Sequence, residues 1–242
     1  MCDTCGCQHE SLIQNGPVST PGPTGQFKIQ VRESVLESND QQAMANKEYL
    51  NSRKVFAINM MGSPGSGKTS LIVEAVRALR EDVPVYVIEG DQFGSLDSER
   101  IREAGVDVIQ INTGNGCHLD AASVGKAIRQ LPLTAKSLLI IENVGNLVCP
   151  AMFDLGEHKK VVVLSVTEGD DKPVKYAPMF HEASVCIINK TDLLGLVDFD
   201  VDKALSHLRK INNKLVVFPM SATTGQGIPE WVEAIKKWIV SL

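Results

Sequence analysis

The sequence has no long hydrophobic run. No stretch approaches the roughly 18 uninterrupted apolar residues that a membrane-spanning helix requires. The first residues also lack the basic and then apolar segments of a secretory signal peptide. We therefore expect a cytoplasmic protein with no membrane partner.

Clusters of basic residues are also absent. Lys and Arg together number 24 against 29 for Asp and Glu, which gives a formal net charge of −5. Proteins that bind nucleic acid through its phosphates usually carry a basic patch, so this composition argues against a nucleic-acid partner. Other proteins and small ligands are the expected partners.

The length of 242 residues and the hydrophobic content of 43% suit one α/β domain with an appendage, and no internal repeat is visible. Residues 8 to 30 are rich in Gly, Pro, Ser and Thr and lack periodicity, which is typical of a mobile linker. We expect residues 1–30 to form a flexible N-terminal tail, 31–52 a lead-in helix and 53–242 the main domain.

Within the main domain, short apolar and β-branched runs alternate with helix-like segments. Such strands, separated by helices, indicate a mainly parallel sheet with helices on both faces. The expected strands span residues 55–60, 85–89, 106–111, 137–142, 160–166, 184–189 and 215–220. The expected helices span residues 69–80, 119–131, 203–213 and 229–241.

A phosphate-binding motif directly follows the first expected strand. "GSPGSGKTS" fits the pattern G-x-x-x-x-G-K-[ST], in which glycines let backbone N–H groups surround phosphate oxygens. Lys68 adds positive charge at the β- and γ-phosphates, and the Thr69 hydroxyl can bind Mg²⁺. The expected contacts are Gly62, Ser63, Pro64, Gly65, Ser66, Gly67, Lys68, Thr69 and Ser70. The motif predicts the P-loop NTPase fold.

Two later motifs indicate that the base is guanine. In "NKTD", comprising Asn189, Lys190 and Asp192, an ionised Asp can accept from both N1–H and the N2 amine of guanine, whereas adenine offers neither. In "SATTGQG", which begins with Ser221, the Ala222 N–H can reach the guanine O6. Each motif alone also fits a simple turn with a helix cap. In this order after a P-loop, they predict GTP or GDP as the ligand.

Two carboxylates complete a predicted magnesium site. Asp91 follows the second expected strand, and Glu142 ends the fourth. Mg²⁺ held by Thr69, water and one or both carboxylates would neutralise charge between the β- and γ-phosphates. Alternatively, Glu142 is only a carboxylate at a strand end. The expected catalytic residues are Lys68, Thr69, Asp91 and Glu142.

The loop after Glu142 departs from the common D-x-x-G pattern. Glu replaces Asp, and Asn146 rather than Gln follows Gly145, whose backbone N–H can contact the γ-phosphate. No residue is an obvious choice for orienting the attacking water, although Asp91 is a candidate. We therefore expect a GTPase, forming GDP and phosphate, with low intrinsic turnover.

Three of the six cysteines form a C-x-x-C-x-C cluster at the N-terminus. In a reducing compartment, cysteines are better interpreted as metal or redox ligands than as disulfides. Thiolates of Cys2, Cys5 and Cys7 leave one coordination position, which the α-amine exposed by removal of Met1, or His9, can fill. A planar N,S environment suits Ni²⁺ and a tetrahedral one suits Zn²⁺. Redox-sensitive cysteines without a metal are the alternative.

A second ligand set lies within the main domain. Cys117 and His118 follow the third expected strand, and Cys149 lies shortly after the fourth. Each alone also fits a structural residue, as we expect for Cys186 in the apolar run "SVCIINK". Together, at neighbouring strand ends, the three indicate a shared metal site. Three ligands suit a metal that must leave again, and a two-fold dimer would pool six.

The position of Cys149 predicts a mechanical link between the two sites. It lies on the segment that begins at Glu142, so a loop that shifts with the γ-phosphate would move this sulfur. Nucleotide state and metal affinity would then be coupled, typically by roughly 5- to 150-fold, and reciprocally.

Taken together, the motifs resemble those of the hydrogenase nickel-incorporation GTPases, the HypB-type accessory proteins. The shared segments are "CDTCGC", which only some members carry, and "GSPGSGKTS", "EGD", "TGNGCHLDA", "ENVGNLVCP", "EGDDKP" and "NKTDLL". The resemblance implies a GTPase that dimerises across bound nucleotide. It also implies delivery of Ni²⁺ to the large subunit of [NiFe] hydrogenase, together with a partner nickel metallochaperone.

The resemblance also implies roles for the ligand residues. Cys2, Cys5 and Cys7 match a high-affinity nickel motif. The residues that match a Ni²⁺ or Zn²⁺ site of the main domain are Cys117, His118 and Cys149. Lys172 in "EGDDKP" is either a contact near the nucleotide or dimer face or a solvated lysine. The chain lacks the His-rich tract of some relatives, so bulk nickel storage is not implied.

Three other functions stay open at this point. A urease-type accessory GTPase shares the nucleotide motifs, but the cysteine cluster and the separated ligands favour the hydrogenase type. A nickel- or zinc-binding buffer protein with vestigial GTPase activity is disfavoured by the intact Lys68, Thr69 and Asp192. A generic signalling GTPase would leave the ligand residues unused.

Overall fold

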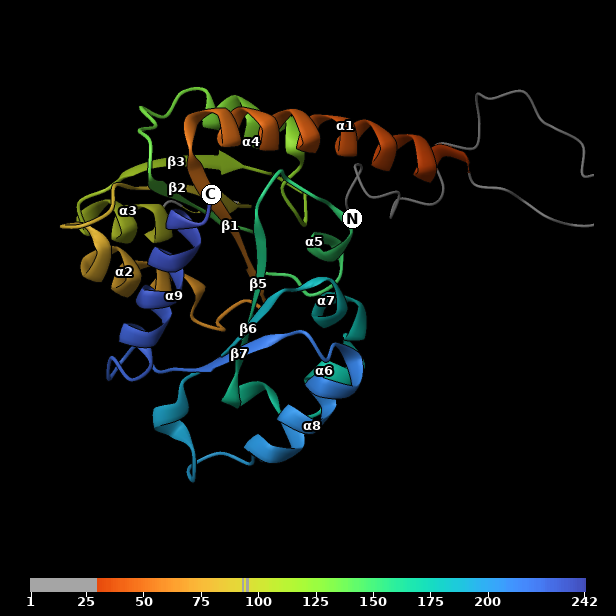
Figure 1. The fold of residues 1–242 in the computed structure, drawn as a ribbon. Coiled ribbons are helices and arrows are strands. Elements are labelled where there is room, and N and C mark those ends of the chain that lie inside the picture. The colour runs from red at the N-terminus through yellow and green to blue at the C-terminus, as the bar shows by residue number, and fades with distance from the viewer. Residues whose placement is uncertain (1–29, 93, 95) are drawn as a thin grey trace, which may run out of the picture.

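The computed structural model describes residues 30–92, 94 and 96–242. Its centre is a sheet of seven strands, all parallel, in the order β3-β2-β4-β1-β5-β6-β7 (Figure 1). The strands are β1 (Val55–Gly62), β2 (Val85–Asp91), β3 (Asp107–Asn112), β4 (Ser137–Glu142), β5 (Lys159–Ser165), β6 (Val185–Asn189) and β7 (Val216–Pro219). The predicted parallel sheet is confirmed, and each strand lies within a few residues of its expected range.

Helices and short 3-10 turns connect the strands. They are α1 (Gln30–Arg53), α2 (Lys68–Leu79), α3 (Leu96–Glu103), α4 (Ala121–Ile128), α5 (Cys149–Met152), η1 (Val166–Glu168), α6 (Lys172–Lys175), α7 (Ala177–Glu182), η2 (Thr191–Leu193), α8 (Val201–Ile211) and α9 (Ile228–Val240). The expected helices are present. The helices α3, α5, α6 and α7 were not predicted, because short helices give little periodicity to detect. The helix α4 is as short as α3, but it was predicted within a longer helix-like stretch, 119–131.

Two helix starts differ from their expected positions because aspartates cap them. Asp120 accepts a hydrogen bond from Ser123 N at 2.8 Å, so α4 begins at residue 121 rather than 119. Asp200 accepts one from Lys203 N at 3.0 Å, so α8 begins at residue 201 rather than 203. A capping side chain fixes the first helical residue because it satisfies a backbone N–H that has no partner within the helix.

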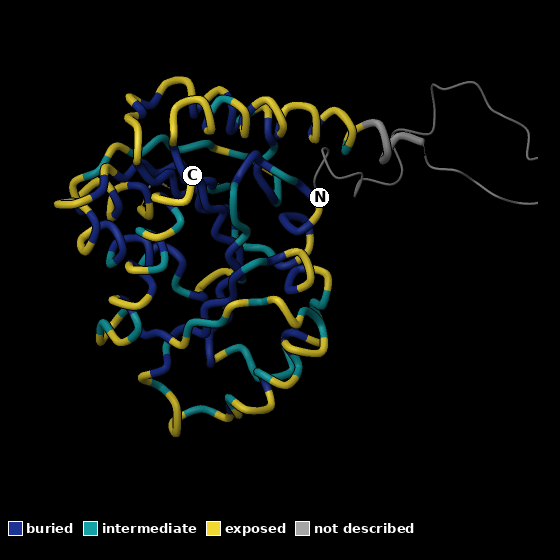
Figure 2. The backbone as a smooth tube through the Cα atoms, viewed as in Figure 1, coloured by how far each residue is buried: buried dark blue, intermediate teal, exposed yellow. Residues whose placement is uncertain are grey.

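The strand β1 shows why the sheet is covered on both faces. Phe56 and Ile58 point into a core that α2 and α9 cover, whereas Val55 and Ala57 point into a second core under α1 and α4. Successive side chains of a strand point to opposite faces, so a strand buried on both faces must be apolar throughout. Figure 2 shows that buried residues concentrate in the strands and that exposed residues follow the outer side of α1.

The helix α1 lies beside α4 (Figure 1) and is anchored by two asparagines. Asn46 Nδ2 donates to the carbonyls of Ala121 at 2.7 Å and Leu155 at 3.0 Å. Asn39 donates to the carbonyl of Asp154 at 2.8 Å and accepts from Ala121 N at 2.9 Å. The helix α1 therefore covers the range expected for the lead-in helix and packs against α4 and β1.

The N-terminal tail lies outside the described residues, and with it the predicted ligands Cys2, Cys5 and Cys7 and the neighbouring His9. Among the helices that the structure describes, none combines the length and the apolar character that crossing a membrane would need.

Candidate functional site

The carboxyl ends of parallel strands gather at one edge of a sheet, and this edge is where α/β proteins bind ligands. A cavity of about 480 Å³ opens there, between the P-loop and the ends of β2 and β4. The predicted site residues that line it are Pro64, Gly65, Gly67, Lys68, Thr69, Ser70, Asp91, Glu142, Gly145 and Lys190. Most of the expected phosphate contacts and all the expected magnesium ligands therefore meet in one cavity, whereas Gly62, Ser63 and Ser66 do not line it.

The P-loop runs from the end of β1 to the first residue of α2. Gly67 caps α2 with a φ of 95°, and a Cβ at this position would overlap the side-chain amide of Asn189. Glycine is therefore required here for both its conformation and its size. The N-terminal N–H groups of α2 face the cavity and make a favourable site for phosphate.

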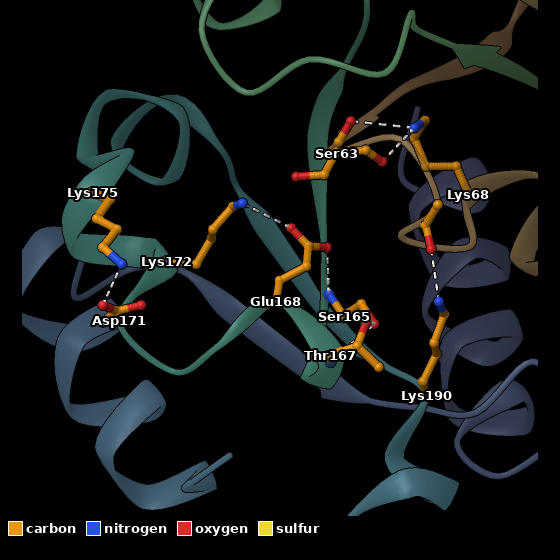
Figure 3. A network of polar contacts seen from close by, with 11 residues as sticks. Ser63, Lys68, Ser165, Thr167, Glu168, Asp171, Lys172, Lys175 and Lys190 are labelled. Carbon is orange, nitrogen blue, oxygen red and sulfur yellow. Dashed lines mark hydrogen bonds and ion pairs between the residues drawn. The ribbon is translucent and has the colours of Figure 1, made fainter. Parts of the chain in front are cut away.

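Lys68 lies at the base of the P-loop and is only 7% exposed. Its Nζ donates to the carbonyls of Gly62 and Ser63, both at 3.2 Å (Figure 3). Burial lowers the pKa of Lys68, while the negative charge of Glu142 opposes that shift. The ammonium is thus placed beside the phosphate position and close to a carboxylate.

The predicted magnesium ligands Thr69 and Glu142 are in direct contact. Thr69 Oγ1 donates to Glu142 Oε1 at 2.8 Å. Glu142 is buried, and burial raises its pKa to about 7, although the charge of Lys68 and the hydrogen bond from Thr69 act in the opposite direction. A cation at this position would relieve the cost of burying the charged carboxylate.

A further carboxyl group, Glu89, was missed in the sequence. It lies on β2 directly opposite Glu142 of β4 and is only 3% exposed. Burial, followed by the charges of Glu142 and Asp91, raises its pKa to about 8. The spacing in "EGD" could have identified Glu89, because residues 89 and 91 of a strand point to the same face and Asp91 was already assigned to the site.

These residues fit Mg²⁺. Glu89 Oε2 and Glu142 Oε2 are buried oxygens without a hydrogen-bond partner, and hard oxygen ligands of this kind suit Mg²⁺. Asp91 lines the same cavity, but its two oxygens accept from Gln92 N and Gly94 N, both at 2.7 Å. Glu142, with the Thr69 hydroxyl bonded to it and Glu89 opposite it, could therefore hold Mg²⁺, whereas Asp91 lies at the cavity wall with both oxygens engaged.

The two predicted base-recognition loops lie side by side next to the P-loop. Asn189 donates to the carbonyl of Ser66 at 2.8 Å and accepts from Ala222 N at 3.4 Å. Lys190 has a φ of 63° and donates from Nζ to the carbonyl of Gly65 at 2.7 Å (Figure 3). Asn189 thus joins all three loops.

Asp192 is held by the second of these loops. Its Oδ1 accepts from Ser221 Oγ at 2.5 Å, and Thr191 N next to it donates to the carbonyl of Met220 at 3.1 Å. The structure therefore brings together the residues that the sequence assigned to guanine recognition, although the chain separates them by almost thirty residues.

The second predicted metal set is also brought together. The sulfurs of Cys117 and Cys149 lie 2.9 Å apart, and Cys117 Sγ lies 3.6 Å from His118 Nδ1. The three donor atoms all lie within 4.8 Å of one another. Cys117 and His118 belong to the loop between β3 and α4, whereas Cys149 opens α5. Soft sulfur and imidazole donors suit Ni²⁺ or Zn²⁺ rather than Mg²⁺.

The His118 ring is fixed by packing. It stacks on Phe153, with ring centroids 3.9 Å apart, and both residues are about 5% exposed or less. Burial lowers the pKa of His118, which favours the neutral ring that binds a metal. Phe153 was not identified from the sequence, because only the fold brings it beside the histidine.

Two other sequence predictions can be compared with the structure. Cys186 is fully buried in an apolar core, as expected, and burial raises the pKa of its thiol. Lys172 Nζ lies 3.5 Å from Glu168 Oε2 (Figure 3). It also lies 5.0 Å from the centre of the Tyr176 ring. This side chain is 22% exposed, and its role near a nucleotide or dimer face stays a prediction.

The parallel sheet, the glycine-rich turn before α2 and the cavity above it define a P-loop nucleotide-binding protein. Residues 56–219 match the model of the CobW/HypB/UreG nucleotide-binding domain family. The hydrogenase maturation factor HypB of Escherichia coli strain K12 is 48% identical over 212 residues, which cover 88% of this chain and 73% of the relative.

Two solved structures are also similar, each with a TM-score of 0.79 over 84% of this chain. HypB from Archaeoglobus fulgidus is 37% identical and covered over 99% of its length. HypB from Helicobacter pylori, solved in complex with nickel, is 35% identical and covered over 96%. The chain belongs to the HypB hydrogenase maturation factors within the CobW/HypB/UreG family. The resemblance noted in the motifs is thereby confirmed.

Proposed function

We propose that this protein is a GTP-hydrolysing nickel metallochaperone that delivers Ni²⁺ during the maturation of [NiFe] hydrogenase. The observation that carries the proposal is the closeness of two different sites. The cluster of Cys117, His118 and Cys149 lies at the same sheet edge as the P-loop, and residues 142–149 join the two.

The nucleotide site accounts for binding and slow hydrolysis of GTP. Lys68 and the start of α2 bind the phosphates, and Asp192 accepts from the guanine edge. Thr69 and Glu142, with Asp91 nearby, would hold Mg²⁺, which would supply positive charge to the phosphates when bound. Asp91 is the candidate for orienting water, but its oxygens are engaged by its own loop, which suits a low intrinsic turnover.

The cysteine–histidine cluster suits a cargo rather than a structural metal. Structural zinc sites usually have four protein ligands, whereas the described residues of each chain supply three to this cluster. An open position lets an incoming ligand displace the ion. A homodimer across a two-fold axis would bring six ligands together and would make metal transfer sensitive to assembly.

The remaining parts of the proposal rest on the sequence and on the family. Cys2, Cys5 and Cys7 form the high-affinity nickel motif, and the main-domain cluster binds Ni²⁺ or Zn²⁺. The expected partners in the cytoplasm are a second copy of this chain, a partner nickel metallochaperone and the hydrogenase large subunit. A nickel complex of the Helicobacter pylori relative supports nickel as the cargo.

Measuring GTP turnover and Ni²⁺ binding on the same preparations of the full chain tests the proposal. Lys68→Ala should abolish turnover and leave nickel binding intact. Replacing Cys117 and Cys149 by Ser should remove nickel from the main domain and leave GTP binding intact. Absence of hydrolysis above background with Mg²⁺, Ni²⁺ and partner proteins present would contradict the proposal and favour a metal-buffering protein.

A further inference from the structure

Asn146 is a residue to which the nucleotide site assigns no role, and its side chain contacts both segments that carry the metal ligands. Its Nδ2 donates to the carbonyl of Cys117 at 3.2 Å. Its Oδ1 accepts from Val148 N at 2.8 Å, immediately before Cys149. One side-chain amide therefore joins the loop of the first cysteine to the start of the helix that carries the second.

The backbone of the same residue is attached to the P-loop. Asn146 forms an antiparallel bridge with Gly62, the first residue of the P-loop motif. The preceding Gly145 lies against Pro64 so closely that a Cβ would come within 2.8 Å of Pro64 Cγ and 3.0 Å of its Cα. Any displacement of Gly145 relative to the P-loop therefore reaches Asn146 directly.

The chemistry of the contact requires an amide. The carbonyl of Cys117 needs a donor and Val148 N needs an acceptor, and an asparagine side chain supplies both. Aspartate would keep the acceptor for Val148 N but would place a negative oxygen against the carbonyl of Cys117. Alanine would supply neither group. Asn146 is half-buried, so water competes only partly for these bonds.

Two other amides near the site make a more limited connection. Gln92 donates to the carbonyl of Gly116 at 3.1 Å, which lies in the first ligand loop only. Asn143 accepts from Leu119 N at 3.1 Å, in the same first segment, and donates to Asn59 Oδ1 at 3.3 Å within the core. Asn143 also accepts from Val144 N at 3.0 Å, near the start of the second segment. Among these three side chains, only Asn146 contacts the backbone of one cysteine, Cys117, and of the residue directly before the other, Val148.

We propose that Asn146 is the positioning residue that links the γ-phosphate position to the metal ligands. This inference rests on the proposed function, because it names the residue through which nucleotide state changes nickel affinity. When Gly145 shifts against the P-loop, Asn146 changes the separation between the Cys117 loop and the start of α5. The two sulfurs then approach or separate, and the affinity for Ni²⁺ changes with them.

The test uses the full chain with Cys2, Cys5 and Cys7 replaced by Ser, so that nickel reports on the main domain alone. Ni²⁺ is titrated with GDP and with a non-hydrolysable GTP analogue, and the nickel–thiolate absorption band is followed. We expect the two affinities of this background protein to differ by roughly 5- to 150-fold. Asn146→Asp and Asn146→Ala should each bring the ratio of the two Ni²⁺ affinities to within about twofold of unity. A ratio this close to unity means that nucleotide state and nickel affinity are no longer coupled.

Asn112→Ala provides a matched control. Asn112 Oδ1 accepts from Gly114 N at 2.8 Å in the first ligand loop, but it has no hydrogen bond to the second ligand segment among those described. This variant should retain the background ratio. Nucleotide affinity and thermal unfolding, measured on each protein, separate loss of coupling from loss of fold. If Asn146→Ala is unstable, the test relies on Asn146→Asp.

The possible outcomes separate failure of the role of Asn146 from failure of the proposed function. A coupled background protein with an unchanged ratio in both Asn146 variants overturns the role of Asn146 alone. An Asn112→Ala ratio that falls as far as the Asn146 ratios also overturns it, because any disturbance of the loop would then suffice. A background protein that binds no nickel, or binds it equally in both nucleotide states, overturns the proposed function as well.

Discussion

The P-loop and the cysteine–histidine cluster lie at the same sheet edge but are held in different ways. The P-loop is one continuous segment, and its shape depends on glycines and on backbone carbonyls that contact Lys68. The cluster combines two segments that are 32 residues apart at Cys117 and Cys149 and are joined by side chains. A site built within one segment is rigid, whereas a site built across two can change when the segments move.

The two sites also differ in electrostatics. Buried carboxyl groups with raised pKa values, Glu89 and Glu142, surround the cavity over the P-loop. The cluster instead has two sulfurs and a histidine whose pKa is lowered by burial. The first environment favours a hard divalent cation and the second a softer one. Under the proposed function, Mg²⁺ and Ni²⁺ would therefore bind at separate sites with different donor atoms.

The largest effect is expected from a substitution that removes the packing of Phe153 against His118 of the cysteine–histidine cluster. Phe153→Ala should lower the free energy of unfolding by roughly 3–5 kcal/mol, as is typical when a buried Phe is truncated. It should also free the His118 ring and weaken nickel binding to the main domain. Urea unfolding and nickel titration measure both effects.

Phe153→Leu is the control, because it keeps most of the buried volume while removing the ring stack. It should restore most of the stability but not the nickel affinity. If Phe153→Ala binds nickel as tightly as the unaltered protein, the dependence of the cluster on this packing is wrong.

An intermediate effect is expected at the base-recognition loop. Asp192→Asn removes the carboxylate that accepts from guanine, and loss of such a charged hydrogen bond costs about 1.5–3 kcal/mol, or roughly 10- to 150-fold in affinity. Preference should shift toward xanthosine nucleotides, whose base presents a carbonyl in place of the N2 amine. Competition between GDP and xanthosine diphosphate measures this shift, and unchanged discrimination would count against the assignment of Asp192.

The smallest effect is expected on the stability of the fold, at the contact of His158 with β1 and α1. His158 Nδ1 accepts from Ala57 N of β1, and Nε2 contacts Asn51 Oδ1 of α1, both at 2.9 Å. Burial, with the nearby charge of Lys47, lowers the pKa of His158 to about 4. The fold therefore favours the neutral His158 ring, whose pKa lies below the unfolded value of 6.5. The stability that the neutral ring contributes is complete above pH 6.5 and is lost as the pH falls toward 4.

His158→Asn should therefore reduce the loss of stability on acidification between pH 7 and 4.5, on the order of 1–2 kcal/mol, because solvent at the partly exposed ring screens its charge. Urea unfolding at the two pH values measures the difference. His181→Asn, at a histidine whose side chain is 69% exposed, is the control and should leave the pH dependence unchanged. An equal change in both variants would reject the role of the buried ring.

Local motifs account for most of what the sequence could predict. The apolar strands predicted the parallel sheet, and the glycine pattern predicted the P-loop between Gly62 and Thr69, because backbone conformation there depends on neighbouring residues. Glu89 was missed because a strand residue looks the same whether it faces a core or a cavity. Phe153 and the anchoring asparagines of α1 were missed because their partners lie far away in the chain.

The central claim is that nucleotide state moves one metal ligand relative to another. X-ray absorption at the nickel edge tests it most directly, on the full chain with Cys2, Cys5 and Cys7 replaced by Ser and with Ni²⁺ bound. The number or distance of the sulfur neighbours of nickel should differ between the GDP form and the form with a non-hydrolysable GTP analogue. Superimposable nickel spectra in the two forms, with equal nickel affinities, would contradict it.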